Sequence, residues 1–446
     1  MNDHTYSWHP QPTSLLTDHY ELTMLQAALR AGTASRRSVF EVFARRLPHG
    51  RRYGVFAGVG RVLEGLEQFR FTDEQLRFLR DTAVVDAATV AYLENFRFTG
   101  QIRGYAEGET YFPYSPLLSV ESSFAEACVL ETFILSVLNY DSAVASAASR
   151  MVGAAGDRPC IEMGSRRAHE QAAVAAARAA VVAGFESTSN LEAGFRYGVK
   201  TVGTAAHSFT LLHDSEEQAF RAQLDALGVS TALLVDTYDV ERAVRLAVEI
   251  AGPDLGGVRL DSGDLVTQAA SVRALLDRLG NPHTRITVTS DLDEYAIAAL
   301  RAAPVDAYGV GTRLVTGSGA PTSSMVYKLV SREGASGTME PVAKASSGKA
   351  SVGGEKYALR RRNAHGVATH EMVGVSHLPE DDGDDRPLLV DYMTGGELRD
   401  GFTGPEAVQR ARVRHAESIA ELPRAARRLS EGEPVIPTVI EPGTAH

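Results

Sequence analysis

A short apolar run, a polar or glycine-rich tip and a helical stretch follow one another repeatedly between about residues 157 and 316. The apolar runs with their tips are "CIEMGSRR", "KTVGTAAHS", "ALLVDTYD", "GVRLDSGD", "ITVTSDLDE" and "AYGVGTRLV". The segments between them, such as Ala168 to Gly184 and Asp239 to Ala251, are helical in composition or periodicity. Alternating strands and helices form a parallel sheet, and this many units favour a closed or nearly closed α/β barrel over an open sheet. The polar tips should then converge at the carboxyl ends of the strands, where such barrels build their active sites.

The segments on either side of this pattern predict a second, flanking α+β domain. "TDHYELTMLQAALRAG" is typical of a helix with a capping box made by Asp18 and Glu21, and "SVFEVFARRL" and "QIRGYAEGETYF" are typical of strands. The C-terminal part carries strand-like pieces, "MVYKLV" and "YALRRR", and then a basic helix, "AVQRARVRHAESIAEL". We therefore expect an irregular parallel α/β barrel with a flanking α+β domain built from the N-terminal and C-terminal segments. The expected boundaries are 1–130 for the N-terminal part, 131–325 for the barrel and 326–446 for the C-terminal segment that packs with the flanking domain.

Composition excludes several classes of protein. The 446 residues carry a formal net charge of −11, which argues against a nucleic-acid or anionic-membrane binder, because such proteins need a basic surface. The only cysteines, Cys128 and Cys160, show no C-x-x-C spacing, so we expect neither a cysteine zinc site nor a disulfide framework. No signal-peptide pattern opens the chain, and no uncharged apolar run approaches the roughly 20 residues that a membrane helix needs. We expect a soluble cytoplasmic protein, in which any polyanionic ligand needs a local concentration of positive charge.

The tip after the run "GVRL" carries the densest chemistry. Arg259 ends the predicted strand, and Asp261, Ser262 and Asp264 follow around Gly263. The arginine could bind a carboxylate or phosphate, while the carboxylates could hold ribose hydroxyls or a magnesium ion. The structural alternative is that Asp261 and Ser262 cap the next helix while Arg259 pairs with an acid.

Two further tips could bind anions. "AYGVGTRLV" places Gly309, Gly311 and Thr312 at a strand end, where backbone N–H groups and a hydroxyl can approach an anion. "EMGSRRAHE" places Arg166 and Arg167 before a long helix, whose N-terminus favours negative charge. The structural alternatives are a plain glycine turn and a helix start with solvated arginines.

The tip "TSDLDE" predicts a capping box rather than a ligand site. Ser290 or Asp291 would cap the next helix, and Glu294 would reach back to the cap. Contact of Asp291 or Asp293 with a ligand is the alternative.

A single histidine, His207, follows the run "KTVG". It lies among small residues that include Thr204 and Ser208, which leave room for a bulky ligand. Neutral imidazole is a good base and a good nucleophile towards phosphorus or carbon. No carboxylate occurs from Lys200 to Leu212, so an anionic group could approach without local repulsion. The structural alternative is a histidine that is satisfied by a neighbouring backbone carbonyl.

Taken together, these motifs resemble those of nicotinate phosphoribosyltransferases. The resemblance covers roughly residues 13 to 350, and the last hundred residues match only loosely. In order and spacing, the matching motifs are "LLTDHYELTM", "RRLPHGRRYGVFAG", "MGSRRAHE", "GTAAHSF", "GVRLDSGDL" and "GVGTRLVT". The resemblance implies transfer of ribosyl phosphate from phosphoribosyl pyrophosphate to the ring nitrogen of nicotinate. The products would be nicotinate mononucleotide and pyrophosphate, at the start of NAD biosynthesis by salvage.

The resemblance also implies roles for individual residues. The family couples ATP hydrolysis through a phosphorylated histidine that matches His207. On chemical grounds we also expect Mg2+, which would neutralise the leaving pyrophosphate. The family's nicotinate contacts match Tyr20, Thr204 and Arg259, and its ribosyl-donor contact matches Thr312. Because the tyrosine reaches a site shared between subunits, a homodimer is implied.

Chemical reasoning adds several candidates beyond the resemblance. Cleavage of the bond to ribose builds positive charge on the sugar, which the carboxylate of Asp261 could stabilise. Arg166, Ser208 and Gly311 are further candidates for substrate binding, whereas no metal ligand can be assigned. The alternatives are a nicotinamide phosphoribosyltransferase, a decarboxylating transferase that uses a pyridine dicarboxylate, and a non-catalytic nucleotide-binding barrel.

Overall fold

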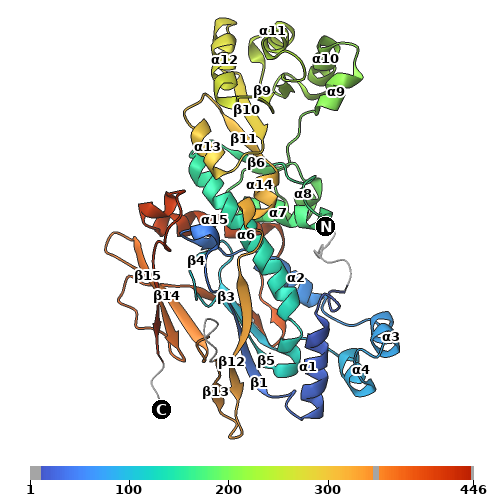
Figure 1. Cartoon of the computed structure of the whole chain (residues 1–446), viewed down its shortest axis with the longest axis vertical. Helices are drawn as coiled ribbons and strands as arrows, with labels where there is room; N and C mark the ends of the chain where they lie inside the picture. The colour runs from blue at the N-terminus through green and yellow to red at the C-terminus, as the bar shows by residue number, and fades with distance from the viewer. Residues whose placement is uncertain (1–11, 345–350, 443–446) are drawn as a thin grey trace. The chain divides into compact units, whose positions relative to one another are not determined.

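The computed structural model describes residues 12–344 and 351–442, and the chain divides into two compact units (Figure 1). One unit takes residues 1–146 and 320–446, and the other takes residues 147–319. The second unit therefore contains the whole strand–helix repeat. The three-part division with boundaries at 130 and 325 stays a prediction.

The second unit is built around a parallel sheet of six strands. Their order is β7-β6-β11-β10-β9-β8, and every neighbouring pair is parallel. The α/β class with a parallel sheet is therefore confirmed. Among the described residues no ladder joins β7 to β8, so closure into a barrel stays a prediction. In chain order the elements are the end of α6 (Glu131–Ala155), β6 (Cys160–Glu162), α7 (Glu170–Val182), β7 (Ser187–Thr188), α8 (Leu191–Tyr197), α9 (His207–Leu212), α10 (Glu216–Leu227), β8 (Ala232–Leu234), α11 (Val240–Ala251), the 3-10 helix η2 (Gly252–Asp254), β9 (Gly257–Leu260), α12 (Leu265–Arg278), β10 (Arg285–Ser290), α13 (Glu294–Leu300), β11 (Ala307–Val310), α14 (Thr312–Val315) and η3 (Gly317–Gly319).

Five of the six predicted strands are present, and the sixth is wrong. "KTVGTAAHS" makes a single isolated parallel bridge, from Thr201 to Thr188, in place of a strand. The residues that follow, 203–206, are small and mostly exposed, so they bury little surface against a neighbouring strand. His207 consequently lies at the start of α9 rather than on a strand tip.

Both helices predicted in this unit are confirmed. α7 is buried at every position from Ala173 to Val182, and its many alanines allow neighbouring elements to approach closely. α11 begins after Asp239, whose side chain accepts a hydrogen bond from the backbone N–H of Arg242. That contact satisfies one of the free N–H groups at the helix start.

The first unit contains a seven-stranded sheet to which both ends of the chain contribute. The strand order is β13-β12-β1-β5-β3-β17-β18, with β1 antiparallel to both β12 and β5. A second sheet has the order β16-β14-β15-β19, and β2 pairs with β4. The elements are α1 (His19–Arg30), β1 (Arg37–Ala44), η1 (Pro48–Gly50), β2 (Gly54–Val55), α2 (Val59–Glu67), α3 (Asp73–Asp81), α4 (Ala87–Glu94), β3 (Gln101–Tyr105), β4 (Thr110–Tyr111), β5 (Leu118–Ser123), α5 (Phe124–Cys128), the start of α6, β12 (Met325–Glu333), β13 (Met339–Pro341), β14 (Lys356–Arg362), β15 (Ala368–Val375), β16 (Arg386–Pro387), β17 (Leu389–Thr394), β18 (Glu397–Leu398), α15 (Gly404–Glu421), η4 (Arg424–Arg427) and β19 (Thr438–Glu441).

The start of α1 differs from the prediction. The helix begins after Asp18 as expected, but the side chain of Asp18 makes no capping hydrogen bond. The carboxylate of Glu21 instead accepts hydrogen bonds from Thr132, from its backbone N–H at 2.9 Å and its hydroxyl at 2.6 Å, and another from Thr17. The capping box is therefore wrong, because a contact with α6 replaces the local one.

Neither a disulfide nor a membrane-crossing helix is found in the described part of the chain. Cys128 and Cys160 are both free and buried. None of the helices described there combines the length and the apolarity that a membrane crossing requires.

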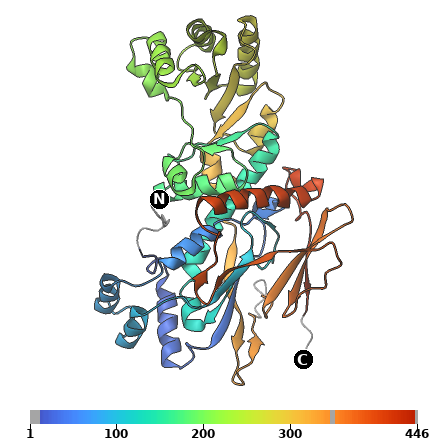
Figure 2. The same cartoon turned by 180° about the vertical axis from the view of Figure 1, so that it is seen from behind.

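The basic C-terminal helix α15 is drawn in red in Figure 2. It packs against β4, beside a buried network of charges. The guanidinium of Arg360, which is fully buried, lies 2.7 Å from the carboxylate of Glu371 and 3.5 Å from that of Glu109. It also donates hydrogen bonds to the hydroxyl and the carbonyl oxygen of Thr110. Burial alone would lower the pKa of Arg360, but the two carboxylates raise it above its usual value, so the guanidinium stays charged.

Replacing Arg360 by methionine should destabilise the protein by about 3–5 kcal/mol, because the buried carboxylate of Glu371 loses the cation 2.7 Å away, while Glu109 keeps Arg386 at 2.9 Å. Chemical denaturation would measure the loss. The matched control is Arg399→Met, since Arg399 and Asp391 form an exposed pair, 53% and 55% accessible. Arg399→Met should lower the free energy of unfolding by less than about 1 kcal/mol. Equal losses in the two variants would contradict a stabilising role for the network.

Candidate active site

A cavity of about 940 Å³ lies within the second unit. Alternate residues of neighbouring strands line it, as the two-residue period of a strand requires. On β9, Gly257 and Arg259 line the cavity, whereas Val258 and Leu260 are fully buried on the other face. β10 and β11 follow the same rule. Their lining residues are Arg285, Thr287, Thr289, Ala307 and Gly309, and the residues between them, Ile286, Val288 and Tyr308, are fully buried. Ser290, the last residue of β10, also lines the cavity and is the exception to the alternation.

Glycines bring the tips of β6 and β11 close together. A Cβ on Gly164 would overlap the Val315 side chain and lie 3.1 Å from the carbonyl oxygen of Gly311. A Cβ on Gly309 would overlap the Thr289 methyl group and lie 2.7 Å from the Met163 sulfur. These glycines are therefore required for the close approach of the neighbouring chain segments.

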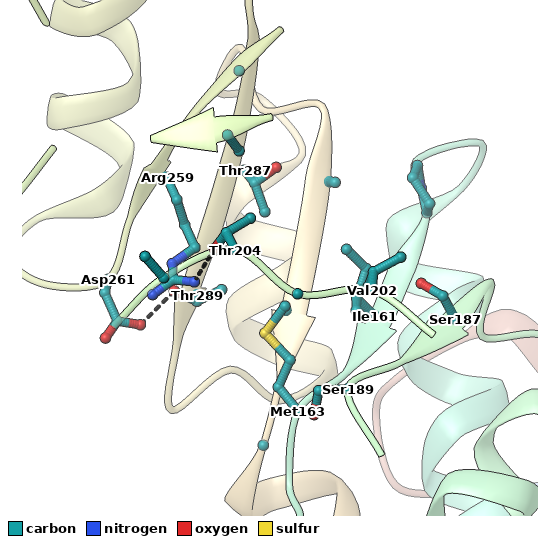
Figure 3. A pocket seen from close by; sticks show the side chains of 18 of the residues that line it. Ile161, Met163, Ser187, Ser189, Val202, Thr204, Arg259, Asp261, Thr287 and Thr289 are labelled. Atoms are coloured by element: carbon teal, nitrogen blue, oxygen red, sulfur yellow. Dashed lines mark hydrogen bonds between the residues drawn. The ribbon is translucent and has the colours of Figure 1, made fainter. Parts of the chain in front are cut away.

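Arg259 points into the cavity, where Figure 3 shows it beside Thr204. One terminal nitrogen donates a hydrogen bond to the Thr204 hydroxyl at 2.8 Å. The Nε atom is buried and has no hydrogen-bond partner among the described residues. Burial lowers the pKa of Arg259 below its usual value, although Asp261 and Asp236 act in the opposite direction. The guanidinium therefore keeps donor capacity for an anion in the cavity.

The capping alternative for the "LDSGD" tip is wrong. Asp264 caps α12 by accepting from the N–H of Thr267, so Asp261 and Ser262 are free of that role. Asp261 accepts a hydrogen bond from the Thr289 hydroxyl (Figure 3). Ser262 donates to the carboxylate of Asp236 at 2.8 Å.

The imidazole of His207 lies between two carboxylates. Its Nε2 atom is 3.9 Å from Oδ1 of Asp236 and 4.0 Å from Oδ2 of Asp261. Its Nδ1 atom shares a hydrogen bond of 3.0 Å with the Thr237 hydroxyl. The expectation that His207 lacks acidic neighbours is therefore wrong, because the fold brings carboxylates from two other segments. The backbone-carbonyl alternative fails too, since the partner of Nδ1 is a hydroxyl.

Sequence reasoning gave no site role to Asp236 and Thr237. The side chain of Asp236 is only 2% exposed and accepts hydrogen bonds from Ser262 and from the Asp261 N–H. Its Oδ1 atom, the one that faces His207, has no hydrogen-bond partner in residues 12–344 and 351–442. The signal was present in "ALLVDTYD", where an acid and a threonine directly follow a predicted strand.

The two tips that were predicted to bind anions both reach the cavity. Arg166 and Arg167 line it before α7, and Gly311 and Thr312 line it at the start of α14. The cavity thus gathers arginines, backbone N–H groups and a hydroxyl at the carboxyl ends of the strands, as the repeat pattern predicted.

The tip "TSDLDE" does not form the predicted capping box. Asp293 caps α13 by accepting from the N–H groups of Tyr295 and Ala296. Glu294 turns inward and pairs with Arg150 at 3.0 Å. Asp291 lines the cavity, so the ligand-contact alternative stays open for it.

Comparison with known proteins points to one family. Residues 15–139 match the model of the nicotinate phosphoribosyltransferase (NAPRTase) N-terminal domain. The chain is 55% identical to nicotinate phosphoribosyltransferase pncB1 of Mycobacterium tuberculosis over 96% of this chain and 95% of that protein. It is 38% identical to the nicotinate phosphoribosyltransferase of Bacillus subtilis, over 74% of this chain and 69% of that protein. The crystal structure of human nicotinic acid phosphoribosyltransferase superposes with a TM-score of 0.81 at 27% identity, covering 95% of this chain and 97% of that one.

The chain belongs to the nicotinate phosphoribosyltransferase family.

Two residues with roles predicted for this family do not line the cavity. Ser208 lies on α9, is exposed and is absent from the lining. Tyr20 belongs to the other unit, where its side chain is 45% exposed on α1. Partial burial and the nearby carboxylates of Glu131 and Glu21 raise the pKa of Tyr20 to about 12, so its phenol is neutral. Substrate binding by Ser208 and by Tyr20 stays a prediction.

In this member of the family, Gly164→Ala should separate the β6 and β11 tips, because the added methyl group overlaps Val315. Overpacking of this kind costs about 1–3 kcal/mol of stability. Displacement of one tip should also weaken a hydrogen bond to a bound anion, so pyrophosphate should bind about tenfold more weakly by calorimetry. Gly153→Ala is the control, since Gly153 is helical and a Cβ there meets nothing within 4 Å. Unchanged pyrophosphate binding by Gly164→Ala would contradict an anion site between these tips.

Proposed function

We propose that this protein is a nicotinate phosphoribosyltransferase, which transfers the phosphoribosyl group of phosphoribosyl pyrophosphate to nicotinate. The products are nicotinate mononucleotide and pyrophosphate, and the reaction serves NAD biosynthesis by salvage. One observation carries the proposal: a single cavity of the family's fold is lined by Thr204, Arg259 and Thr312, the matches to the family's substrate contacts. The 55% identity over 96% of the chain supports it.

Arg259 and Thr204 bind the carboxylate of nicotinate in this proposal. A guanidinium offers a planar pair of donors that fits a carboxylate, and the Nε atom of Arg259 has no competing partner among the described residues. The mutual hydrogen bond of 2.8 Å holds both side chains in place before substrate binds. An uncharged amide gains less from this cation, so the acid is the preferred substrate.

The ribosyl donor binds at the tips of β6 and β11. Arg166 supplies charge, Gly311 offers a backbone N–H, and Thr312 adds a hydroxyl. As the bond between C1 and the pyrophosphate oxygen lengthens, positive charge develops on the sugar, and the carboxylate of Asp261 stabilises it. The ring nitrogen of nicotinate donates the electron pair that forms the new bond, and pyrophosphate leaves with the old pair.

The carboxylates of Asp261 and Asp291 suit a magnesium ion, which favours hard oxygen ligands. Mg2+ is usually bound by one or two carboxylates together with substrate phosphates, and these two residues line the cavity. When bound, the ion neutralises charge on the leaving pyrophosphate.

His207 accepts the terminal phosphoryl group of ATP in this proposal. When Nδ1–H donates to Thr237, the lone pair of Nε2 is free to attack phosphorus; a nitrogen–phosphorus bond forms, and the bond to ADP breaks. The carboxylates of Asp236 and Asp261 favour the positive charge that develops on the ring. Asp236 is a positioning residue, because it touches His207 rather than the reacting phosphate.

The remaining parts of the proposal concern assembly and location. The active form is a homodimer in which Tyr20 of one subunit reaches the site of its partner, where its ring stacks on the pyridine. The exposed side chain and neutral phenol of Tyr20 support this role. The protein works in the cytoplasm, where its two free cysteines stay reduced.

Incubation with ATP labelled at the γ-phosphate should produce a phosphoprotein that is labile in acid and stable in base. His207→Ala should carry no label, and His213→Ala, at the residue that follows the same helix, is the control. Equal labelling of the wild type and His207→Ala would rule out the phosphohistidine.

The variant Asp236→Asn tests, in the same labelling experiment, whether Asp236 positions His207. The amide keeps the shape of the side chain but removes the charge beside Nε2, so the labelling rate should fall by about 10²-fold. The affinity for ATP should stay unchanged. An unaltered labelling rate would remove Asp236 from this role.

Arg259→Ala should raise the KM for nicotinate by about 10–100-fold, the value of a charge-assisted hydrogen-bond pair. The KM for phosphoribosyl pyrophosphate should change little. Steady-state kinetics with each substrate varied in turn would measure both, and Arg278→Ala, on the last turn of α12, is the control. A change confined to the ribosyl donor would place Arg259 at the phosphates, and faster turnover of nicotinamide than nicotinate by the wild type would overturn the substrate assignment.

A further inference from the structure

The last residue of β6, Glu162, carries a carboxylate that is completely buried directly before the tip "MGSRR". No cationic side chain pairs with it among the described residues. Burial raises the pKa of Glu162 above its usual value, and hydrogen bonds from Thr188 and from the N–H of Gly164 act in the opposite direction. Buried carboxylates are costly without a cation, so an acid at this position indicates a role beyond packing.

Each oxygen of this carboxylate accepts a hydrogen bond from a different strand end. One oxygen accepts from the backbone N–H of Gly164, in the tip that follows β6. The other accepts from the hydroxyl of Thr188, the last residue of β7. Both contacts are buried, so Glu162 joins the tip of β6 to the end of β7 where water does not compete.

The ionised carboxylate matches both of these donors. A backbone N–H can only donate, so the oxygen that faces Gly164 must accept. The hydroxyl oxygen of Thr188 accepts a hydrogen bond of 2.9 Å from the N–H of Asn190, and its own proton is available to the second carboxylate oxygen. A glutamine at position 162 would turn an NH2 group towards one of the two donors and weaken that link.

The tip that Glu162 holds carries Arg166. The N–H of Arg167 donates to the carbonyl oxygen of Gly164 at 2.8 Å, which closes a turn over Ser165 and Arg166. A second link joins this turn to the segment after β7, because the side-chain amide of Asn190 donates to the Ser165 hydroxyl oxygen at 2.9 Å. The position of Arg166 in the cavity lining therefore depends on where Gly164 is held.

We propose that Glu162 is a positioning residue for the ribosyl donor. Its carboxylate fixes the turn of residues 164–167 against the end of β7, so that Arg166 meets the phosphates of the donor in a preformed arrangement. This inference rests on the proposed function. Glu162 acts through the turn rather than by contact, since its side chain is fully buried and does not line the cavity.

The proposed role is selective for one substrate. Donor groups that are fixed in advance lose less freedom when the anion binds, so the loss of Glu162 should appear in the affinity for the ribosyl donor. Nicotinate depends instead on Arg259 and Thr204, which hold one another at 2.8 Å. The hydrogen bonds of the Glu162 side chain go to Gly164 and Thr188, so the nicotinate contacts do not depend on it directly.

Glu162→Gln keeps the shape of the side chain and removes one of its two links. The KM for phosphoribosyl pyrophosphate should rise about tenfold, while the KM for nicotinate should change by less than about twofold. Steady-state kinetics with each substrate varied in turn would measure both values. Calorimetry should show a similar weakening for pyrophosphate alone, which reports on the tip without turnover.

The other end of the link offers a matched pair of variants. Thr188→Val removes the hydroxyl but keeps the branched shape, and it should raise the KM for the ribosyl donor several-fold. Thr188→Ser retains the hydroxyl and should bring this KM back towards the wild-type value. Thr284→Val is the control, because Thr284 is a buried threonine of the same unit whose hydroxyl donates to the Leu255 carbonyl oxygen at 2.9 Å, away from the cavity lining. If Glu162→Gln does not fold, the Thr188 variants still test the link.

The outcomes separate the two proposals. An unchanged KM for the ribosyl donor, or an equal rise in the two KM values, would overturn the positioning role. A lower KM for the donor in Glu162→Gln would overturn it as well, because the buried charge would then act mainly by repelling phosphates. Failure of the wild type to form nicotinate mononucleotide would instead overturn the proposed function, and pyrophosphate binding would still show whether Glu162 holds the tip.

Discussion

The second unit depends on the two-residue period of its parallel strands. One face of each strand carries residues such as Val258, Val288 and Tyr308, whose complete burial stabilises the sheet. The other face carries small or functional residues that line the cavity. Because the two sets alternate along most of each strand, burial of one face can stabilise the sheet while the other face lines a cavity. The cavity can form because one face of each strand packs in the core and stabilises the sheet, while the other face lines the space for a ligand.

The chain is acidic overall, so its positive charge must be placed where anions bind. Arg166, Arg259 and Arg285 all line one cavity, although the formal net charge is −11. Carboxylates share that space, and Asp236 and Asp261 lie within about 4 Å of His207. Opposite charges so close together create a strong local field, which orders water and substrate and costs little reorganisation during reaction. That arrangement suits a reaction in which charge builds on both a sugar and a leaving group.

The sequence alone predicts the helices and strands that have a periodic hydrophobic pattern. It fails to predict side-chain partners that come from distant parts of the chain. The α/β class, five strands and helices α7 and α11 follow from hydrophobic pattern and composition. The capping boxes failed because Glu21 and Glu294 bind side chains far away in the sequence, Thr132 and Arg150. For the same reason the sequence did not identify Asp236 as a site residue. Asp236 lies close to His207 only because the segment after β8 and the start of α9 meet in the folded chain. The resemblance identified residues within motifs, but it could not show which acids surround the histidine.

The position of the two carboxylates also bears on why a phosphohistidine would drive the reaction. A phosphoryl group on Nε2 of His207 would bring about two negative charges close to Asp236 and Asp261. Like unit charges 4 Å apart repel by about 4 kcal/mol at the effective dielectric constant of a protein surface. Such a phosphoenzyme is therefore strained electrostatically and gains stability when magnesium and arginine side chains gather around it. In the proposed mechanism the same cations also bind the ribosyl donor and pyrophosphate, so phosphorylation and substrate binding would act on one shared set of charges. The energy of ATP would then be coupled to the affinity of the site through electrostatics, without a separate mechanical element.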